Sequence, residues 1–285
     1  MKMGKIRRWA WAALLLFSLA LGVSRASAFT VPERLVFDLK WLGIKAGTAV
    51  LEVREGSGGG LMIVSTAESD PWVSVFYTVR DRVESVLSDR ADPEAPEDGG
   101  AGGEGAALPA SSGDPGPAET PSPEGSLGVY GLLPVNYHIM TREGRHRKDK
   151  EITFDRARGK ALYMDHLNGE RKEAEVPYGV HDPLSSFYLV RTMDLQVGKS
   201  VYVPVFDSKR LWSVEVQVLR KERVEVKAGA FDAIVIKPLM KSEGIFSRKG
   251  DIYIWLTDDE RRMPVLLRSE VAVGSIDAEL VKAGW

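Results

Sequence analysis

Side chains able to carry out nucleophilic catalysis stand together in the middle of the chain. His181 and Asp182 are followed closely by Ser185, and these are the residue types of a hydrolase triad. However, Asp182 stands directly before Pro183, and this pair is typical of a helix cap followed by the first helical residue. The sequence also has no Gly-x-Ser-x-Gly nucleophile elbow. Hydrolysis by Ser185, His181 and Asp182 is therefore the function that the sequence favours least, and no catalytic residue is predicted.

The spacing of the histidines does not predict a metal site. Zinc sites are typically marked by cysteines, or by histidines in short repeated spacings. The chain has no cysteine, and none of its four histidines stands in such a pattern: His138, His146, His166 and His181. We therefore expect the histidines to have structural roles, and we expect no metal and no cofactor.

A run of basic residues surrounds a turn that Glu143-Gly144 predicts. Its members are Arg142, Arg145, Arg147, Lys148 and Lys150. In a strand, Arg145 and Arg147 would face away from the two lysines. Two interpretations remain open. The run is either a solvated hairpin with Glu143 and Asp149 as counter-charges, or a contact surface for anionic lipid headgroups, lipopolysaccharide phosphates or an acidic partner.

The elements that would position these residues are mostly strands. Apolar and polar residues alternate with a period of two in many segments, for example 35–39, 49–53, 212–218 and 252–256. Asn168-Gly169 is a strong hairpin signal between two of the strands. The exception is a segment with apolar residues at helical spacing after Asp182. We predict a mainly β protein: a strongly bent antiparallel sheet or an open β-barrel, with one short helix at about 182–193.

A bent sheet has a concave face that side chains, a helix or a ligand must cover. The predicted helix is long enough to lie across that face, and bulky aromatic residues of late strands would line the same space. The candidate ligand-binding residues are therefore Leu184, Phe187, Tyr188, Trp212, Tyr253 and Trp255. Core packing of all six is the alternative, because alternation does not tell which face of each strand is concave.

The first 28 residues predict export from the cytoplasm. Basic residues at 2–8 precede an apolar stretch at 9–23, and Ala26-Ser27-Ala28 fits a cleavage site. We expect a mature protein that begins at Phe29 and lies in the periplasm, with secretion as the alternative. No later segment is apolar for long enough to span a bilayer. Without cysteine, the protein has no disulfide and no lipid attached to an N-terminal cysteine.

Residues 90–128 differ in composition from the rest of the chain. Pro, Gly, Ala, Ser and Glu dominate this segment, and Leu108 and Leu127 are its only large apolar residues. Such a composition predicts a disordered insert within a single β domain at 29–285; a linker between two domains is the alternative. When 1–28 and 90–128 are set aside, basic and acidic residues are equal in number. This balance argues against nucleic-acid binding.

Three stretches carry a family resemblance: Leu35 to Ala49, His181 to Arg191, and a late set at 228–231, 254–259, 264–265 and 274–276. In this order they resemble a bacterial envelope family known as domain of unknown function 3108. The resemblance covers nearly all of the mature chain except 90–128. It implies a periplasmic protein built on a strongly bent antiparallel sheet, and it brings no agreed enzymatic activity or cofactor.

These observations favour an exported, non-enzymatic envelope protein. It would bind an apolar ligand, such as a lipid or a glycolipid, or an envelope protein, on its curved sheet. The alternative is a structural or assembly module with a filled core and no small-molecule ligand. The first hypothesis rests on the architecture of the predicted sheet.

Overall fold

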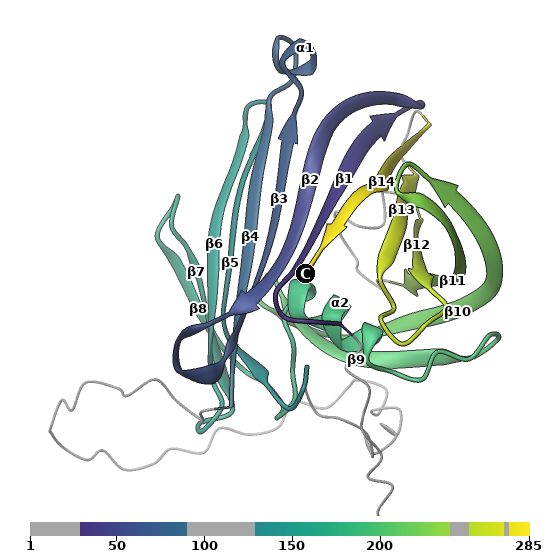
Figure 1. The fold of residues 1–285 in the computed structure, drawn as a ribbon. Coiled ribbons are helices and arrows are strands. Elements are labelled where there is room, and N and C mark those ends of the chain that lie inside the picture. Colours follow the sequence, from purple (N-terminus) through teal and green to yellow (C-terminus); the bar gives the residue numbers. More distant parts are fainter. Residues whose placement is uncertain (1–28, 90–128, 240–250, 271–273) are drawn as a thin grey trace, which may run out of the picture.

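The structure is a computed structural model that describes residues 29–89, 129–239, 251–270 and 274–285. In these residues, fourteen strands form one antiparallel sheet in the order β8-β7-β6-β5-β4-β3-β2-β1-β14-β13-β12-β11-β10-β9. Strands that are consecutive in the chain pair with each other, except β8 and β9, and the first strand pairs with the last. The sheet bends strongly, and β8 and β9 remain as its two edges (Figure 1). The predicted bent or open antiparallel fold is therefore confirmed.

The sheet has two arms that meet at the pairing of β1 with β14. The first arm contains β1 (Glu33–Trp41), β2 (Ile44–Glu55), β3 (Leu61–Ser69), β4 (Val79–Ser88), β5 (Leu133–Glu143), β6 (His146–Asp155), β7 (Lys160–Asp165) and β8 (Glu170–Glu175). The second arm contains β9 (Ser200–Asp207), β10 (Arg210–Val226), β11 (Gly229–Leu239), β12 (Ile252–Thr257), β13 (Pro264–Glu270) and β14 (Ser275–Gly284). Short helical segments are η1 (Ser57–Gly59), α1 (Pro71–Ser74) and α2 (Pro183–Arg191).

The hairpin signals of the sequence correspond to turns in the structure. Gly169 has a φ of 76°, which is the backbone conformation that glycine adopts most readily. The side chain of Asn168 accepts a hydrogen bond from the amide of Glu170 at 2.9 Å. Gly144 has a φ of 58° in the turn between β5 and β6. These turns set the register of the hairpins, and so decide which side chains of neighbouring strands meet.

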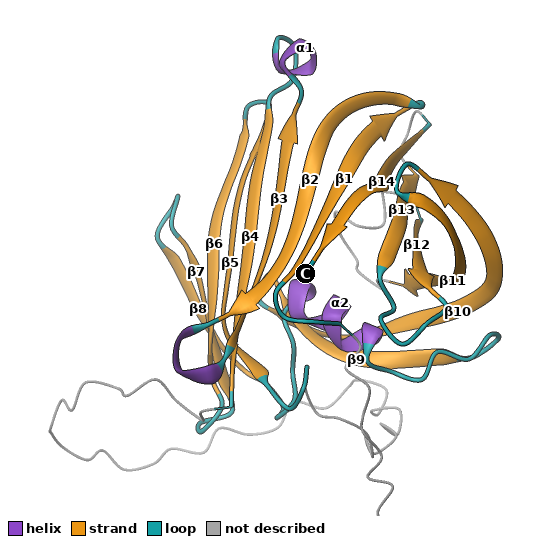
Figure 2. Cartoon of the chain, viewed as in Figure 1, coloured by secondary structure: helices purple, strands orange, loops and turns teal. Residues whose placement is uncertain are grey.

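Helix α2 joins the two edges of the sheet, since it lies between β8 and β9 in the chain (Figure 2). Just before the helix, the amide of His181 donates to the carbonyl of Pro204 at 2.9 Å, and the amide of Phe206 donates to the carbonyl of His181 at 2.8 Å. The helix begins at Pro183, as predicted, and ends at Arg191, two residues before the expected boundary. Figure 1 shows that α2 lies inside the bend of the sheet.

The core consists of three clusters of buried side chains. The first surrounds α2 and draws on both arms, with Ile63 and Val205 among its members. The second lies among β1 and β10–β14 and contains Trp255. In the third, between β5–β7 and β9, the rings of Phe154 and Phe206 meet edge to face at 6.4 Å. Helix α2 thus packs against side chains of both arms of the sheet.

Two segments with sequence predictions, 1–28 and 90–128, lie outside the described residues. The strands on either side of the second segment pair directly, since Ser88 of β4 is opposite Leu133 of β5. Among the described residues, no helix is long and apolar enough to cross a membrane.

Candidate functional site

The structure brings His181, Asp182 and Ser185 together as the buried start of α2. Nδ1 of His181 lies 3.1 Å from Oγ of Ser185, and this hydroxyl donates to Oδ2 of Asp182 at 2.8 Å. In a hydrolase triad, the acid would orient the histidine instead of binding the serine. Backbone amides of Leu184 and Ser185 also donate to Asp182, at 2.8 and 2.9 Å. This arrangement is a capping box, and all three residues are fully buried.

Asp182 also connects α2 to the first arm of the sheet. The hydroxyl of Ser85 on β4 donates to Oδ2 of Asp182 at 2.6 Å. Burial raises the pKa of the Asp182 carboxyl, while hydrogen bonds from Ser85 and Ser185 offset part of that effect. The predicted N-cap therefore holds the helix against β4 as well as capping it.

The three helical residues of the predicted ligand site face the core. Leu184, Phe187 and Tyr188 all pack in the cluster around α2. Tyr188 is fully buried, with its ring 5.0 Å from that of Phe29 and 4.9 Å from the guanidinium of Arg191. Leu184 and Phe187 are only partly buried.

The aromatic residues of the late strands are not brought to the same space. Ile254 of β12 packs in the cluster around α2, whereas Tyr253 and Trp255 pack in the second cluster, because adjacent strand residues point to opposite faces. Nε1 of Trp255 donates to Glu222 at 2.7 Å. Trp212 is partly buried on β10 and belongs to none of the three clusters. The six residues therefore do not line one continuous site.

The basic run lies in the hairpin of β5 and β6. Lys148 and Lys150 share the face of Ile152 and the third core cluster, and Nζ of Lys150 lies 5.8 Å from the ring centre of Tyr163. Arg142 and Arg147 are opposite each other on the other face, and both are exposed. The sequence predicts Arg145 on a strand, but in the structure this residue is exposed in the turn before β6. The cations at the tip of this hairpin are therefore three arginines.

A group of exposed apolar side chains, which sequence reasoning missed, lies in the connection between β3 and β4. It comprises Trp72 in α1 and the residues that follow, with exposed fractions of 51% for Trp72, 76% for Val75 and 86% for Phe76. Large apolar residues in a connection of this kind are not explained by core packing. The sequence could have indicated this group, because a Trp and a Phe stand between two segments in which apolar and polar residues alternate.

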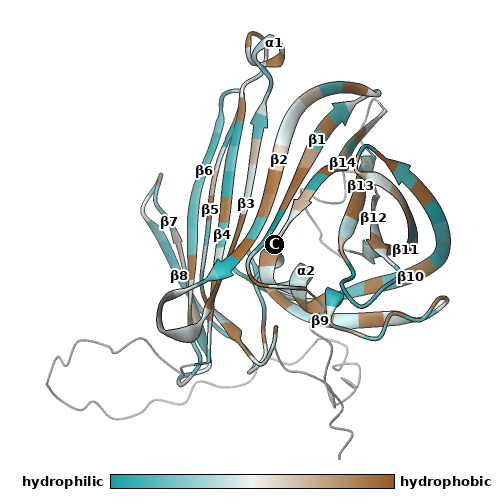
Figure 3. Cartoon of the chain, in the orientation of Figure 1, coloured by the Kyte–Doolittle hydropathy of each residue, from teal (hydrophilic) through white to brown (hydrophobic). Residues whose placement is uncertain are grey.

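The turn between β1 and β2 adds a second exposed apolar group. Trp41, Leu42 and Ile44 are exposed by 48%, 58% and 63%. In an antiparallel meander, alternate connections lie at the same end of the sheet. The β1–β2 turn, the α1 connection and the β5–β6 turn are therefore at one end, as Figure 1 shows. Figure 3 colours part of the α1 connection as hydrophobic.

The basic hairpin touches the apolar connection directly. The amide of Gly144, in the β5–β6 turn, donates to the carbonyl of Thr78 at 2.8 Å. A Cβ added at Gly144 would come within 2.7 Å of the ring of Tyr77, so the ring lies against the backbone of the turn. The tip of the sheet thus combines the apolar residues with exposed Arg145 and Arg147.

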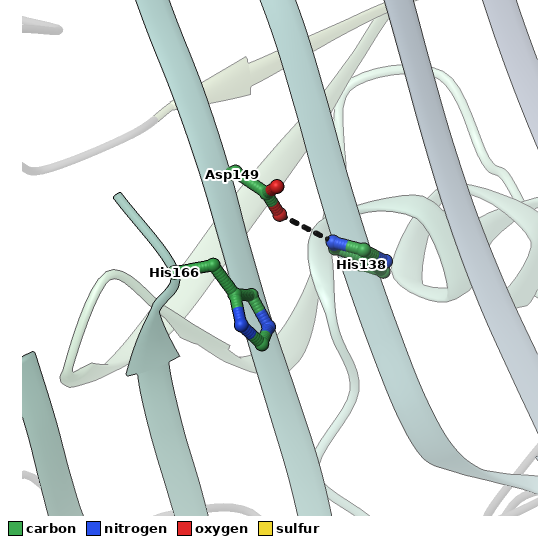
Figure 4. A group of neighbouring side chains, drawn as sticks. All are labelled: His138, Asp149 and His166. Carbon is green, nitrogen blue, oxygen red and sulfur yellow. Dashed lines mark hydrogen bonds and ion pairs between the residues drawn. The ribbon is translucent and has the colours of Figure 1, made fainter. Parts of the chain in front are cut away.

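A second group missed by the sequence contains His138 of β5, Asp149 of β6 and His166, which follows β7 (Figure 4). One potential ligand atom from each residue lies within 4.8 Å of the other two. The residues are far apart in the chain, so no short motif marks them. The register of the two hairpins is what brings them together.

Comparisons with known proteins address the family and the fold. Residues 124–281 match the model of a family described as protein of unknown function, DUF3108. A beta-barrel-like protein of domain of unknown function DUF1849 from Brucella abortus aligns over 90% of this chain and 98% of its own, with 11% identity and a TM-score of 0.50. A Bacteroides fragilis protein with a YmcC-like fold covers 90% of this chain and 97% of its own, with 10% identity and a TM-score of 0.30. No similarity to a curated protein was found.

Proposed function

Because the chain belongs to the DUF3108 family, whose members are described only as proteins of unknown function, we propose a function from the surface of the chain itself. The protein is a non-enzymatic, exported envelope protein that contacts an anionic lipid surface with one end of its sheet. The observation that carries this proposal is the tip at which Trp72, Val75 and Phe76 lie beside the arginines of the β5–β6 turn.

The apolar residues of the tip fit the interfacial region of a bilayer. Aromatic side chains are enriched where membrane meets water, and burying one exposed Phe side chain stabilises a complex by about 1.5–3 kcal/mol. Phe76 is 86% exposed, so nearly all of its side chain is free to make such contact. Trp41 and Ile44 extend the same end of the sheet with further exposed apolar surface.

The arginines beside the tip fit the charge of an anionic membrane. Each Lys or Arg near such a surface contributes about 1 kcal/mol at physiological salt. Arg145 and Arg147 are exposed, and Nη1 of Arg147 donates to the carbonyl of Gly144 at 2.9 Å, which directs its guanidinium toward the turn. Apolar residues and cations together are the combination that binds reversibly to lipid headgroups.

The location of the protein is the second part of the proposal. The signal-like segment 1–28 supports export with cleavage before Phe29, and therefore a periplasmic protein that meets membrane lipids from outside the cytoplasm. A filled core around α2, instead of a bound lipid or glycolipid, is supported by the complete burial of Tyr188. The chain would then act at the membrane as a module that docks there, not as a carrier with an internal ligand.

Sedimentation with lipid vesicles tests the proposal. The mature chain should sediment with vesicles of phosphatidylcholine mixed with phosphatidylglycerol, less well at high salt, and not with phosphatidylcholine alone. Combined Trp72→Ser and Phe76→Ser should abolish binding at an unchanged melting temperature. The matched control is Tyr178→Ser, since Tyr178 is 68% exposed in the segment between β8 and α2.

Charge reversal tests the basic part of the tip. Arg145→Glu with Arg147→Glu should remove the preference for anionic vesicles. Arg158→Glu is the control, because Arg158 is 76% exposed in the β6–β7 turn at the other end of the sheet. Failure of the unaltered chain to sediment with anionic vesicles would overturn the proposal and favour an envelope protein as the partner of the tip.

A further inference from the structure

The outer face of the β5–β7 region carries a compact group of side chains of the types that serve as metal ligands. Tyr137 and Ile152 point into the third core cluster, so His138 and Glu151, next to them in the chain, point to the opposite face. Asp149 lies two residues from Glu151 and therefore shares that face. His166 joins them because its amide donates to the carbonyl of Asp149 at 2.8 Å.

The side chains of this group already contact each other in pairs. Nε2 of His138 lies 2.7 Å from Oδ1 of Asp149, and Nε2 of His166 lies 2.9 Å from Oε2 of Glu151. The two imidazole rings are 5.6 Å apart between their centres. All four side chains are partly exposed to solvent, so an ion can reach them.

We propose that His138, Asp149 and His166 bind a divalent transition-metal ion such as Zn²⁺ on the outer face of the β5–β7 region (Figure 4). Two imidazoles and one carboxylate are the donors that Zn²⁺ takes in sites with an open coordination position. Imidazole donors disfavour Mg²⁺ and Ca²⁺, which prefer oxygen ligands. The site is separate from the membrane tip and goes beyond the proposed function.

The distances require only a small movement of the side chains. In a tetrahedral site with bonds of about 2.1 Å, donor atoms lie about 3.4 Å apart. The three potential donor atoms are now within 4.8 Å of one another. The backbone positions are fixed by the paired strands and by the hydrogen bond between His166 and Asp149, so rotation of the side chains is sufficient.

Glu151 fits the role of a supporting carboxylate. A histidine that binds metal typically donates its other ring N–H to a carboxylate, which orients the ring. When Nε2 of His166 donates to Glu151, Nδ1 carries the free lone pair. Asn136 donates to the other oxygen of Glu151 at 2.6 Å and holds this carboxylate in place.

Titration of the mature chain with Zn²⁺, followed by calorimetry, tests the site. The protein must carry no histidine tag, because a tag would bind the same ions. We expect one ion per chain, a melting temperature that rises with Zn²⁺ because the ion binds the native state, and no such response to Mg²⁺. Vesicle binding by the tip should be the same with and without a chelator, which separates this test from that of the proposed function.

Variants identify the donors. His138→Ala and His166→Ala should each weaken Zn²⁺ binding by more than about tenfold, and Glu151→Gln by about tenfold or more. His146→Ala is the matched control, since His146 is exposed on the same strand as Asp149 but lies outside the group. If the unaltered chain binds no Zn²⁺, or if His138→Ala binds it as tightly as His146→Ala does, the two histidines are only partners of surface carboxylates and the proposal is wrong.

Discussion

Arg191 and Glu33 form a buried, two-pronged ion pair between α2 and the first strand of the sheet. Nη1 and Nη2 of Arg191 donate to the two carboxylate oxygens of Glu33 at 2.7 and 2.8 Å, and both side chains are shielded from solvent. Nε and Nη2 also donate to the carbonyls of Arg262 and Arg261, at 3.0 and 3.1 Å. The guanidinium is thus paired with groups from β1 and from the segment before β13, and it fixes α2 to both arms.

Loss of the carboxylate should destabilise the protein strongly. Glu33→Gln would leave the guanidinium of Arg191 buried without a counter-charge, and breaking such a pair costs about 3–5 kcal/mol. Urea unfolding at neutral pH measures this difference. Glu52→Gln is the control, because its pair with Arg34 is exposed to solvent and contributes at most about 1 kcal/mol. Equal effects of the two substitutions would contradict the structural role of the buried pair.

Asp182→Ala should cost more than the loss of an ordinary helix cap. Replacing an N-cap costs about 1 kcal/mol, but Asp182 also accepts hydrogen bonds from the hydroxyls of Ser85 and Ser185. The hydroxyl of Ser85 would be left buried without this acceptor, at a further cost of about 1–3 kcal/mol, whereas that of Ser185 keeps the backbone carbonyl of residue 182. We therefore expect about 3 kcal/mol in chemical unfolding. Ser85→Ala should recover part of this loss in the double variant, and additive effects would argue against a direct contact.

The sequence predicts the elements of this fold better than the contacts between them. Alternation, Asn168-Gly169 and the Asp182-Pro183 cap identify the strands, a hairpin and the helix from local signals. The contact between Arg191 and Glu33 spans 158 positions and leaves no local pattern. His138 and His166 escape detection for a related reason, since a shift of one residue in either hairpin would turn them to opposite faces. The exposed Phe76 was missed because an apolar residue near a strand is normally assigned to the core.

The stability that Asp38 contributes should depend on pH in the acid range. The side chain lies between Lys45 at 2.8 Å and Lys227 at 3.1 Å, and so connects β1 to the β10–β11 turn. Burial raises the pKa of Asp38, but hydrogen bonds from the two lysines outweigh burial and leave it below the usual value. An aspartate with a lowered pKa stabilises the folded state above about pH 4, and this contribution is lost as the pH falls through the folded-state pKa.

Comparison of Asp38→Asn with the unaltered chain measures this contribution. The difference in unfolding free energy should be about 1 kcal/mol between pH 5 and 8, because both lysines are exposed and solvent screens their attraction. It should shrink below about pH 4, where the carboxyl begins to be protonated in the unfolded chain. Asp232→Asn is the control, since Asp232 is 76% exposed and its pair with Arg223 should contribute little at any pH. A difference that stays constant down to pH 3 would contradict the role assigned to the charge.

Deletion of residues 91–127 should leave the fold intact. The composition of this segment offers little apolar surface to bury, and β4 and β5 on either side of it are already paired. Shortening a long connection changes the closure entropy only slightly, so the melting temperature should change by no more than a few degrees. The deletion must stop before Val129 and Tyr130. Val129 is fully buried, and the hydroxyl of Tyr130 donates to the carbonyl of Phe29 at 2.7 Å. A shortened chain that fails to fold would mean that the segment packs on the sheet.

The residues around α2 distinguish a filled core from a lipid pocket. If the core is filled, Tyr188→Ala should cost about 3–5 kcal/mol, because the ring is fully buried against Phe29 and Arg191. Phe187→Ala should cost less, since its side chain is partly exposed. The unaltered protein should then show no rise in melting temperature with a panel of fatty acids and phospholipids below their micellar concentrations.

A pocket would give the opposite result: added lipid would stabilise the native state by mass action, and Phe187→Ala would reduce that shift while Tyr178→Ala would leave it unchanged. Such a lipid-dependent shift would show that α2 covers a ligand, and the filled-core interpretation would have to be abandoned.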